Sequence, residues 1–204
     1  NIKEINQLNS NFTKMVKELK IGKINLIQTK RRKKVYEEKA NEYHKKSLID
    51  PLSGLYNRSK ADEVMNKEIE AAFLYEKPLA LIMLDVDHFK NINDTLGHLA
   101  GDLVIKEFAK IINYNSRSSD VVIRNGGDEF LIICTNTELQ SAEMFAENLR
   151  VLIENGSYPQ DYKVTSSIGI ASYQRGDTKE DIIDRADKAL YMAKEKGRNS
   201  VVCL

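Results

Sequence analysis

Four carboxylates stand where two predicted strands meet. Asp85 and Asp87 end a continuous apolar run at residues 79–84. Asp128 and Glu129 lie in a glycine-containing turn between two β-rich runs. Like charges at short range repel and lose solvation, so a fold seldom gathers them unless cations neutralise them. Oxygen ligands select magnesium or manganese, which assist phosphoryl and nucleotidyl transfer. The pattern predicts such a site, and the alternative is a pair of solvated turns rich in Asp and Gly.

Other phosphate- and metal-binding motifs do not fit the sequence. A calcium loop of the EF-hand type that began at Asp85 would need glycine where Lys90 stands. The segment 97–102 has the wrong spacing for a phosphate-binding P-loop and carries an acid in place of its lysine. Nucleophile-elbow, zinc-protease and dinucleotide-binding motifs are absent from the sequence. The carboxylates are therefore the main chemical signal.

The hydrophobic pattern indicates which elements position the carboxylates. The run at 79–84 is short and continuous, as in a strand buried on both faces. Runs at 121–124 and 130–134 flank Gly126 and Gly127, which predicts a β-hairpin. Helices are expected at about 61–73, 103–112, 139–153 and 179–196, and further strands at 164–171 and 201–202. This order predicts an α+β fold, with a mainly antiparallel sheet surrounded by helices.

The first 47 residues differ from the rest in composition and charge. They hold 13 Lys and Arg against 5 Glu, whereas the remainder holds 18 Lys and Arg against 25 Asp and Glu. Their apolar residues fit one heptad register, which predicts a long helix with a coiled-coil seam. The register runs through Ile5, Leu8, Phe12, Met15, Leu19, Leu26, Tyr36, Ala40 and Tyr43. We therefore expect a helical signalling segment at 1–47 and a separate domain at 48–204.

Composition limits the function and the setting of this domain. A length of 204 residues allows about one domain of typical size plus an appendage. An acidic body offers no broad basic face, so no nucleic-acid partner is expected. No apolar run approaches the ~20 residues of a membrane helix, so this piece is expected to hold no membrane segment. The two cysteines lack paired spacing, which fits a reducing cytoplasm. The abrupt start suggests the cytoplasmic part of a larger sensor.

The turn sequence Gly126-Gly127-Asp128-Glu129-Phe130 resembles the signature of the GGDEF family of diguanylate cyclases. The resemblance extends in order over residues 50–202. Residues 50–58 resemble the family's D-x-L-T-G-L-x-N-R opening, and residues 85–102 resemble its D-x-D-x-F-K-x-I-N-D-x-x-G-H-x-x-G-D block. Residues 167–171 and 186–199 match its later blocks.

The resemblance implies a fold similar to polymerase palms and class III nucleotide cyclases. Such enzymes condense two GTP molecules into cyclic di-GMP across a homodimer, because each domain holds one GTP. By the motif match, Asp85, Asp128 and the Val86 carbonyl would bind Mg²⁺ or Mn²⁺, and Glu129 would assist metal binding or deprotonate the attacking hydroxyl. Contacts to GTP would come from Asn93, Asp102, His88, Phe89, Lys90, Gly126, Gly127, Lys194 and Arg198. Asn93 and Asp102 correspond to the guanine-binding pair, and Lys194 and Arg198 to phosphate-binding cations.

Arg117 and Asp120 resemble the family's R-x-x-D motif for inhibition by cyclic di-GMP. Many members add an arginine on the next helix, where this chain has Asn148, so we expect weaker inhibition. Two alternatives stay open: a receptor that binds cyclic di-GMP or GTP without turnover, and a structural dimerisation module built on the N-terminal helix. The intact carboxylates at 85, 128 and 129 favour the enzyme.

Overall fold

The computed structural model describes residues 14, 15, 17, 23, 33, 34 and 48–204. The chain divides into two compact units, residues 1–47 and residues 48–204. The six described residues of the first unit have helical backbone. Met15 is the one apolar position of the predicted coiled-coil seam among these six residues. The other apolar seam positions lie outside the described residues. No described helix combines the length and the apolar character that crossing a membrane requires.

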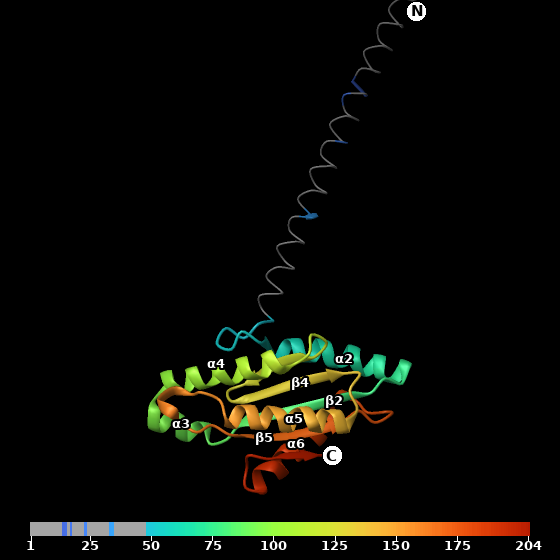
Figure 1. Cartoon of the computed structure of the whole chain (residues 1–204). Coiled ribbons are helices and arrows are strands. Elements are labelled where there is room, and N and C mark those ends of the chain that lie inside the picture. The colour runs from blue at the N-terminus through green and yellow to red at the C-terminus, as the bar shows by residue number, and fades with distance from the viewer. Residues whose placement is uncertain (1–13, 16, 18–22, 24–32, 35–47) are drawn as a thin grey trace, which may run out of the picture. The chain divides into compact units, whose positions relative to one another are not determined.

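Residues 48–204 form one sheet of six strands with helices against both faces (Figure 1). The elements are β1 (Tyr56–Asn57), α2 (Arg58–Tyr75), β2 (Leu79–Val86), α3 (Phe89–Leu96), α4 (His98–Asn115), β3 (Val121–Gly126), β4 (Glu129–Thr135), α5 (Leu139–Glu154), η1 (Pro159–Asp161), β5 (Ser166–Ser172), α6 (Lys179–Glu195) and β6 (Val201–Cys203). The spatial order of the strands is β1-β3-β4-β2-β5-β6.

Three of the five strand pairings are antiparallel, so the predicted α+β fold is confirmed. β2 pairs antiparallel with β4 and β5, and β3 pairs antiparallel with β4. The outer strands β1 and β6 pair parallel with β3 and β5. All eight residues of the central strand β2 are buried, which accounts for its continuous apolar sequence.

Alternation along β2 sorts its side chains between the two faces of the sheet. Ile82 and Leu84 belong to the core beneath α4 and α5. Leu81 and Met83 belong to the core beneath α2 and α6. Asp85 continues the second series, so its carboxylate lies on the α2 and α6 side of the sheet, at the end of the strand.

Local sequence explains where α6 begins and ends. Thr178 and Asp181 form a reciprocal capping box at its start, which satisfies backbone N–H groups of the first turn. Gly197 follows its last turn with φ 108°, a backbone conformation that residues with a Cβ rarely adopt. These two signals place Lys194 in the last turn of the helix.

Candidate active site

The catalytic candidates Asp85 and Glu129 face each other across the antiparallel pair β2 and β4. Side chains of directly opposed residues start about 5 Å apart at their Cβ atoms. The Val86 amide donates to the Asp128 carbonyl at 3.2 Å, which brings the hairpin turn against the end of β2. The structure therefore joins two sequence segments 44 residues apart at one end of the sheet.

Asp85 is a nearly buried carboxylate whose partner is a cation. Its Oδ2 lies 2.8 Å from Lys194 Nζ. Burial raises the pKa of Asp85, the contact with Lys194 acts in the opposite direction, and the nearby charges of Asp128 and Glu129 raise it further. A positive charge is thus already present at this edge to offset the carboxylates. Carboxylate oxygens are also the ligands that a hard divalent cation prefers, and such a cation would neutralise the same negative charges.

Asp87 lies at the same end of β2 as Asp85, but its carboxylate accepts three hydrogen bonds. Its Oδ1 accepts from Ser167 Oγ at 2.6 Å, and its Oδ2 accepts from Thr165 Oγ1 at 2.7 Å. Oδ2 also accepts from the Asn199 amide at 3.0 Å. Within residues 48–204, no three His, Cys, Asp or Glu side chains lie close enough together to hold a metal ion. Hydroxyl and amide donors, which the sequence pattern does not reveal, solvate Asp87 instead of a cation.

The hairpin that carries the signature contains a β-bulge. The register between β3 and β4 shifts between Arg124 and Gly126, so Asn125 is the extra residue. Gly127 has φ 50°, which suits a residue without a Cβ. The Asn125 side-chain amide donates to Glu129 Oε2 at 3.3 Å. Asn125 thus contacts the candidate base.

Arg124 and Asp50 hold this hairpin in place, although neither is among the predicted site residues. Arg124 donates to the Gly127 carbonyl through Nε at 3.0 Å and Nη2 at 2.6 Å. Its Nη1 lies 3.0 Å from Asp50 Oδ1. Burial raises the pKa of Asp50, but hydrogen bonds from Ser53 and Arg124 outweigh that effect and lower it overall. An arginine two positions before the signature and an aspartate opening the first motif are the sequence signals for this contact.

The candidate guanine-binding residues lie on the helical pair α3 and α4. Asn93 on α3 packs against Gly101 on α4 so closely that a Cβ at position 101 would overlap Asn93 Oδ1. Asp102 follows Gly101 directly and is half-buried. The glycine therefore allows the Asn93 side chain to pack against α4 next to the residue that precedes Asp102.

The candidate phosphate contacts lie near the ends of β2 and α6. His88 has φ 56° and caps α3 without a side-chain hydrogen bond. The first amides of a helix have no acceptor within the helix, so those of Phe89 and Lys90 are available to an anion. Lys194 lies in the last turn of α6, and the exposed Arg198 follows three residues after that helix.

The candidate inhibitory residues lie elsewhere. Arg117 and Asp120 precede β3, whereas the signature turn follows it, so the six residues of β3 separate them by roughly 20 Å at ~3.4 Å per residue. The Arg117 amide donates to Asp120 Oδ2 at 2.9 Å, which shapes the loop. Both residues line a small cavity of about 60 Å³ with Phe145 of α5. Asn148 is exposed on α5.

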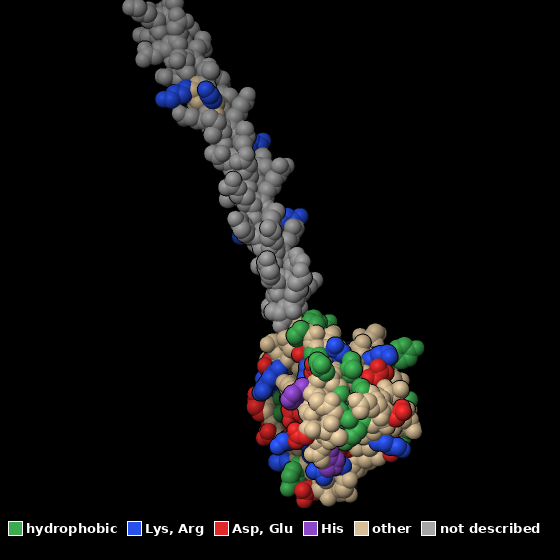
Figure 2. All heavy atoms as spheres, turned by 90° about the vertical axis from the view of Figure 1, so that its left-hand side faces the viewer, with side chains coloured by type: hydrophobic (Ala, Val, Ile, Leu, Met, Phe, Trp, Pro, Cys, Tyr) green, Lys and Arg blue, Asp and Glu red, His purple; other side chains and the backbone are tan. Residues whose placement is uncertain are grey.

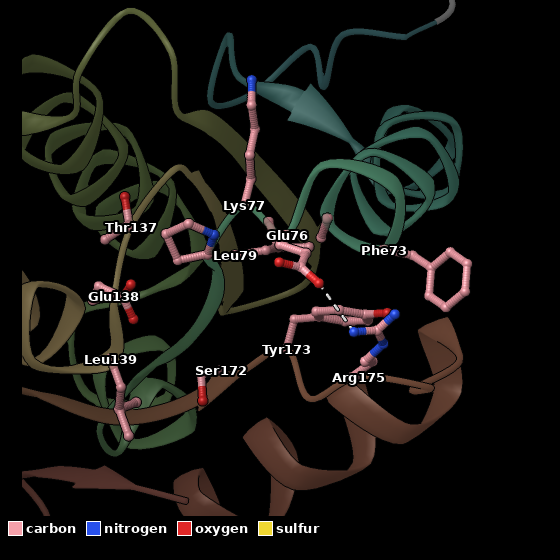
Figure 3. A pocket seen from close by; sticks show the side chains of 12 residues that line it. Phe73, Glu76, Lys77, Leu79, Thr137, Glu138, Leu139, Ser172, Tyr173 and Arg175 are labelled. Carbon is pink, nitrogen blue, oxygen red and sulfur yellow. Dashed lines mark hydrogen bonds and ion pairs between the residues drawn. The ribbon is translucent and has the colours of Figure 1, made fainter.

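A cavity of about 350 Å³ lies at the sheet end opposite the carboxylates (Figure 3). It is lined by Leu79, at the start of β2, and by Ser172, at the end of β5. Glu76 and Arg175 also line it and form an ion pair, with 3.0 Å between Arg175 Nη1 and Glu76 Oε1. This cavity contains none of the candidate catalytic residues and is not part of the active site.

The face seen from the α3 side carries charges of both signs. Figure 2 shows red and blue side chains interspersed there, with apolar side chains between them. No continuous basic surface is visible on this face.

Comparison with known proteins gives consistent matches. The family model described as diguanylate cyclase, GGDEF domain, matches residues 47–200. Diguanylate cyclase A of Treponema denticola is 45% identical over 130 residues, which cover 62% of this chain and 35% of the relative. Diguanylate cyclase VdcA of Vibrio cholerae is 40% identical over 174 residues, which cover 82% of this chain and 50% of the relative. The chain thus spans a third to a half of the length of these two proteins.

A solved structure has a similar fold. The coiled coil and GGDEF domain of DgcB from Caulobacter crescentus, described in complex with c-di-GMP, superimposes with a TM-score of 0.81 at 27% identity. The match covers 89% of this chain and 98% of that one.

Proposed function

The chain belongs to the GGDEF family of diguanylate cyclases, and from this we propose that it condenses two GTP molecules into cyclic di-GMP. Two pyrophosphates leave for each product. The observation that carries the proposal is the meeting of Asp85 and Glu129 across two strands, beside the ammonium group of Lys194. Such a charge arrangement suits a reaction in which anionic phosphates must be bound next to carboxylates.

The side chains divide the reaction among them. The 3′-hydroxyl of one GTP attacks the α-phosphorus of the other, and the bond to pyrophosphate breaks. Glu129 is exposed on the hairpin and is positioned to accept the hydroxyl proton. Lys194, Arg198 and the first amides of α3 bind phosphate oxygens.

Asn93 and Asp102 select the base. Guanine offers N–H donors at N1 and N2, which a carboxylate accepts, whereas the corresponding edge of adenine does not offer this pair. The close packing of Asn93 on Gly101 supports this assignment, because Gly101 is the chain neighbour of Asp102.

Asp85, Asp128, Glu129 and the Val86 carbonyl are the proposed oxygen ligands of a magnesium or manganese ion, because hard cations prefer oxygen ligands. Their carboxylates do not form a three-ligand cluster among the described residues, so binding of an ion would require these side chains to move together. When bound, such an ion neutralises charge on the phosphates and on the leaving pyrophosphate. The ion pair between Asp85 and Lys194 supports the assignment, since a cation already lies beside this carboxylate.

The reaction requires two domains that face each other, each with one GTP. We assign the pairing of two chains to the segment 1–47, and the reaction to a reducing cytoplasm. The thiols of Cys134 and Cys203 are both free, which is compatible with that setting.

Incubation of the purified chain with GTP and Mg²⁺, followed by mass-resolved chromatography, tests the activity. We expect cyclic di-GMP from the unaltered chain and a loss of about 100-fold or more in Glu129→Ala, the range for a removed general base. Glu70→Ala, on the exposed side of α2, is the matched control and should keep full activity. Equal rates in Glu129→Ala would contradict the assigned role. An unaltered chain that binds GTP without forming product would point to a nucleotide receptor.

We also assign feedback binding of cyclic di-GMP to Arg117 and Asp120. An arginine can donate two hydrogen bonds to a guanine edge or to a phosphate. In Arg117→Ala, the cyclic di-GMP concentration for half-inhibition should rise about tenfold or more, while the initial rate without product stays the same. Initial-rate assays with added cyclic di-GMP measure both values. Unchanged inhibition would place the product site elsewhere.

A further inference from the structure

The turn that follows α6 has an unusual backbone. Gly197, Arg198 and Asn199 have φ values of 108°, 69° and 42°, so three consecutive residues lie in the left-handed region. This region is unfavourable for residues with a Cβ, and two of the three have one. Surrounding contacts must therefore hold the turn in shape. It carries Arg198, a candidate phosphate contact.

Asp87 supplies one of these contacts from across the domain. The Asn199 amide donates to Asp87 Oδ2 at 3.0 Å, although the two residues are 112 positions apart. Asp87 is only 4% exposed, and Ser167 and Thr165 donate to it at 2.6 and 2.7 Å. These two donors on and beside β5 hold the carboxylate in one orientation.

Helix α5 holds the same turn through the side chain of Asn199. Arg150 Nη1 donates to Asn199 Oδ1 at 2.8 Å. Asn199 Nδ2 donates to Glu154 Oε1 at 3.0 Å, and Arg150 pairs with Glu154 at 2.9 Å. The backbone amide of Asn199 is thus bound by Asp87, directly after β2, and its side chain is bound by two residues of α5.

The two aspartates at the end of β2 therefore have different partners. Asp85 faces the ammonium group of Lys194, as a residue in the charged site should. Asp87 faces two hydroxyls and one backbone amide, and has no ion pair with any residue of 48–204. Its two oxygens are both engaged in holding neighbouring structure.

We propose that Asp87 is a positioning residue, which acts through the Asn199 amide to hold the strained turn and present Arg198 to the triphosphate of a bound nucleotide. The inference rests on the proposed function for the ligand of Arg198. The hydrogen bond by which Asp87 stabilises the turn does not depend on that function.

A double-mutant cycle in the full chain tests the link to Arg198, with Asp87→Ala, Arg198→Ala and both changes together. Loss of a hydrogen bond to a charged acceptor should raise the KM for GTP about tenfold or more in Asp87→Ala. The double variant should match Arg198→Ala alone, and the Mg²⁺ concentration for half-maximal rate should not change. Additive losses would overturn the inference in favour of a general structural role. A shifted Mg²⁺ dependence would overturn it in favour of metal binding.

Hydrogen exchange of the segment 197–200, measured without nucleotide, tests the hold on the turn. Asp87→Asn keeps the size of the side chain and one acceptor oxygen, so it remains informative if Asp87→Ala does not fold. A neutral acceptor forms a weaker bond than a carboxylate, so exchange should be faster and the KM intermediate. Asp187→Asn, an exposed site on α6, is the matched control and should match the unaltered chain.

The exchange measurement also separates this inference from the proposed function. Faster exchange in a chain without GTP turnover would support the hold on the turn and contradict the cyclase assignment. Unaltered exchange in Asp87→Asn would overturn the positioning role even in an active enzyme.

Discussion

The side chains that face a carboxylate determine what it can do in this domain. Asp85 and Asp87 are both nearly buried and lie two positions apart, yet one pairs with Lys194 and the other accepts three hydrogen bonds. Asp102 is half-buried at the start of α4, beside the glycine on which Asn93 packs. A carboxylate in that position can accept from two N–H donors of a purine edge.

Asp102→Asn should therefore weaken the binding of GTP. A lost hydrogen bond to a charged group costs about 1.5–3 kcal/mol, which corresponds to a rise of roughly 10- to 150-fold in KM. Initial rates at varied GTP concentration measure the change. Asp94→Asn, an exposed aspartate on α3, should have no such effect. A KM for GTP that stays the same in Asp102→Asn would contradict its role in base recognition.

At the scale of elements, the position of α6 depends on a glycine in β5. A Cβ at Gly169 would overlap the Leu190 amide nitrogen and the Ala186 carbonyl, both in the backbone of α6. The helix therefore packs directly on the strand at this point. Since α6 also carries Lys194, this close contact contributes to the position of the cation beside Asp85.

Gly169→Ala should push α6 away from the sheet. Overpacking of this kind lowers the free energy of unfolding by about 1–3 kcal/mol. Urea unfolding followed by circular dichroism measures the loss, and the rate of GTP turnover should fall as well, because Lys194 moves with its helix. An unchanged unfolding midpoint would show that the helix and strand adapt without cost.

At the scale of the whole molecule, the chain combines a domain with one proposed nucleotide site and a separate segment. Residues 48–204 contain their own hydrophobic core on both faces of the sheet. Cyclic di-GMP needs two bound nucleotides, so a single domain is not sufficient for a turnover. Under the proposed function, the rate would therefore depend on how often two domains meet.

A chain limited to residues 48–204 should stay folded but lose most of its activity at low protein concentration. The physical reason is that pairing then depends on diffusion, whereas linked segments raise the effective concentration of the second domain. Specific activity measured over a range of protein concentrations, alongside the full chain, checks this. Equal specific activity at every concentration would exclude a dimerising role for residues 1–47.

The fold class, the central strand and the hairpin with its signature could all be predicted from the sequence. These follow from local information: an apolar run for a strand buried on both faces, and paired glycines for a reversal. The sequence also indicated Asp85 and Glu129, because both lie at strand ends with clear boundaries.

The partners of the remaining polar groups could not be predicted without the folded structure. Asp87 resembles Asp85 in the sequence, but its donors come from β5 and from the turn after α6. Arg124 reaches Asp50 across 74 positions. A buried polar group takes the nearest available donor or acceptor, and which one is nearest depends on how distant segments pack. The local sequence pattern around a polar residue therefore does not predict its hydrogen-bond partner.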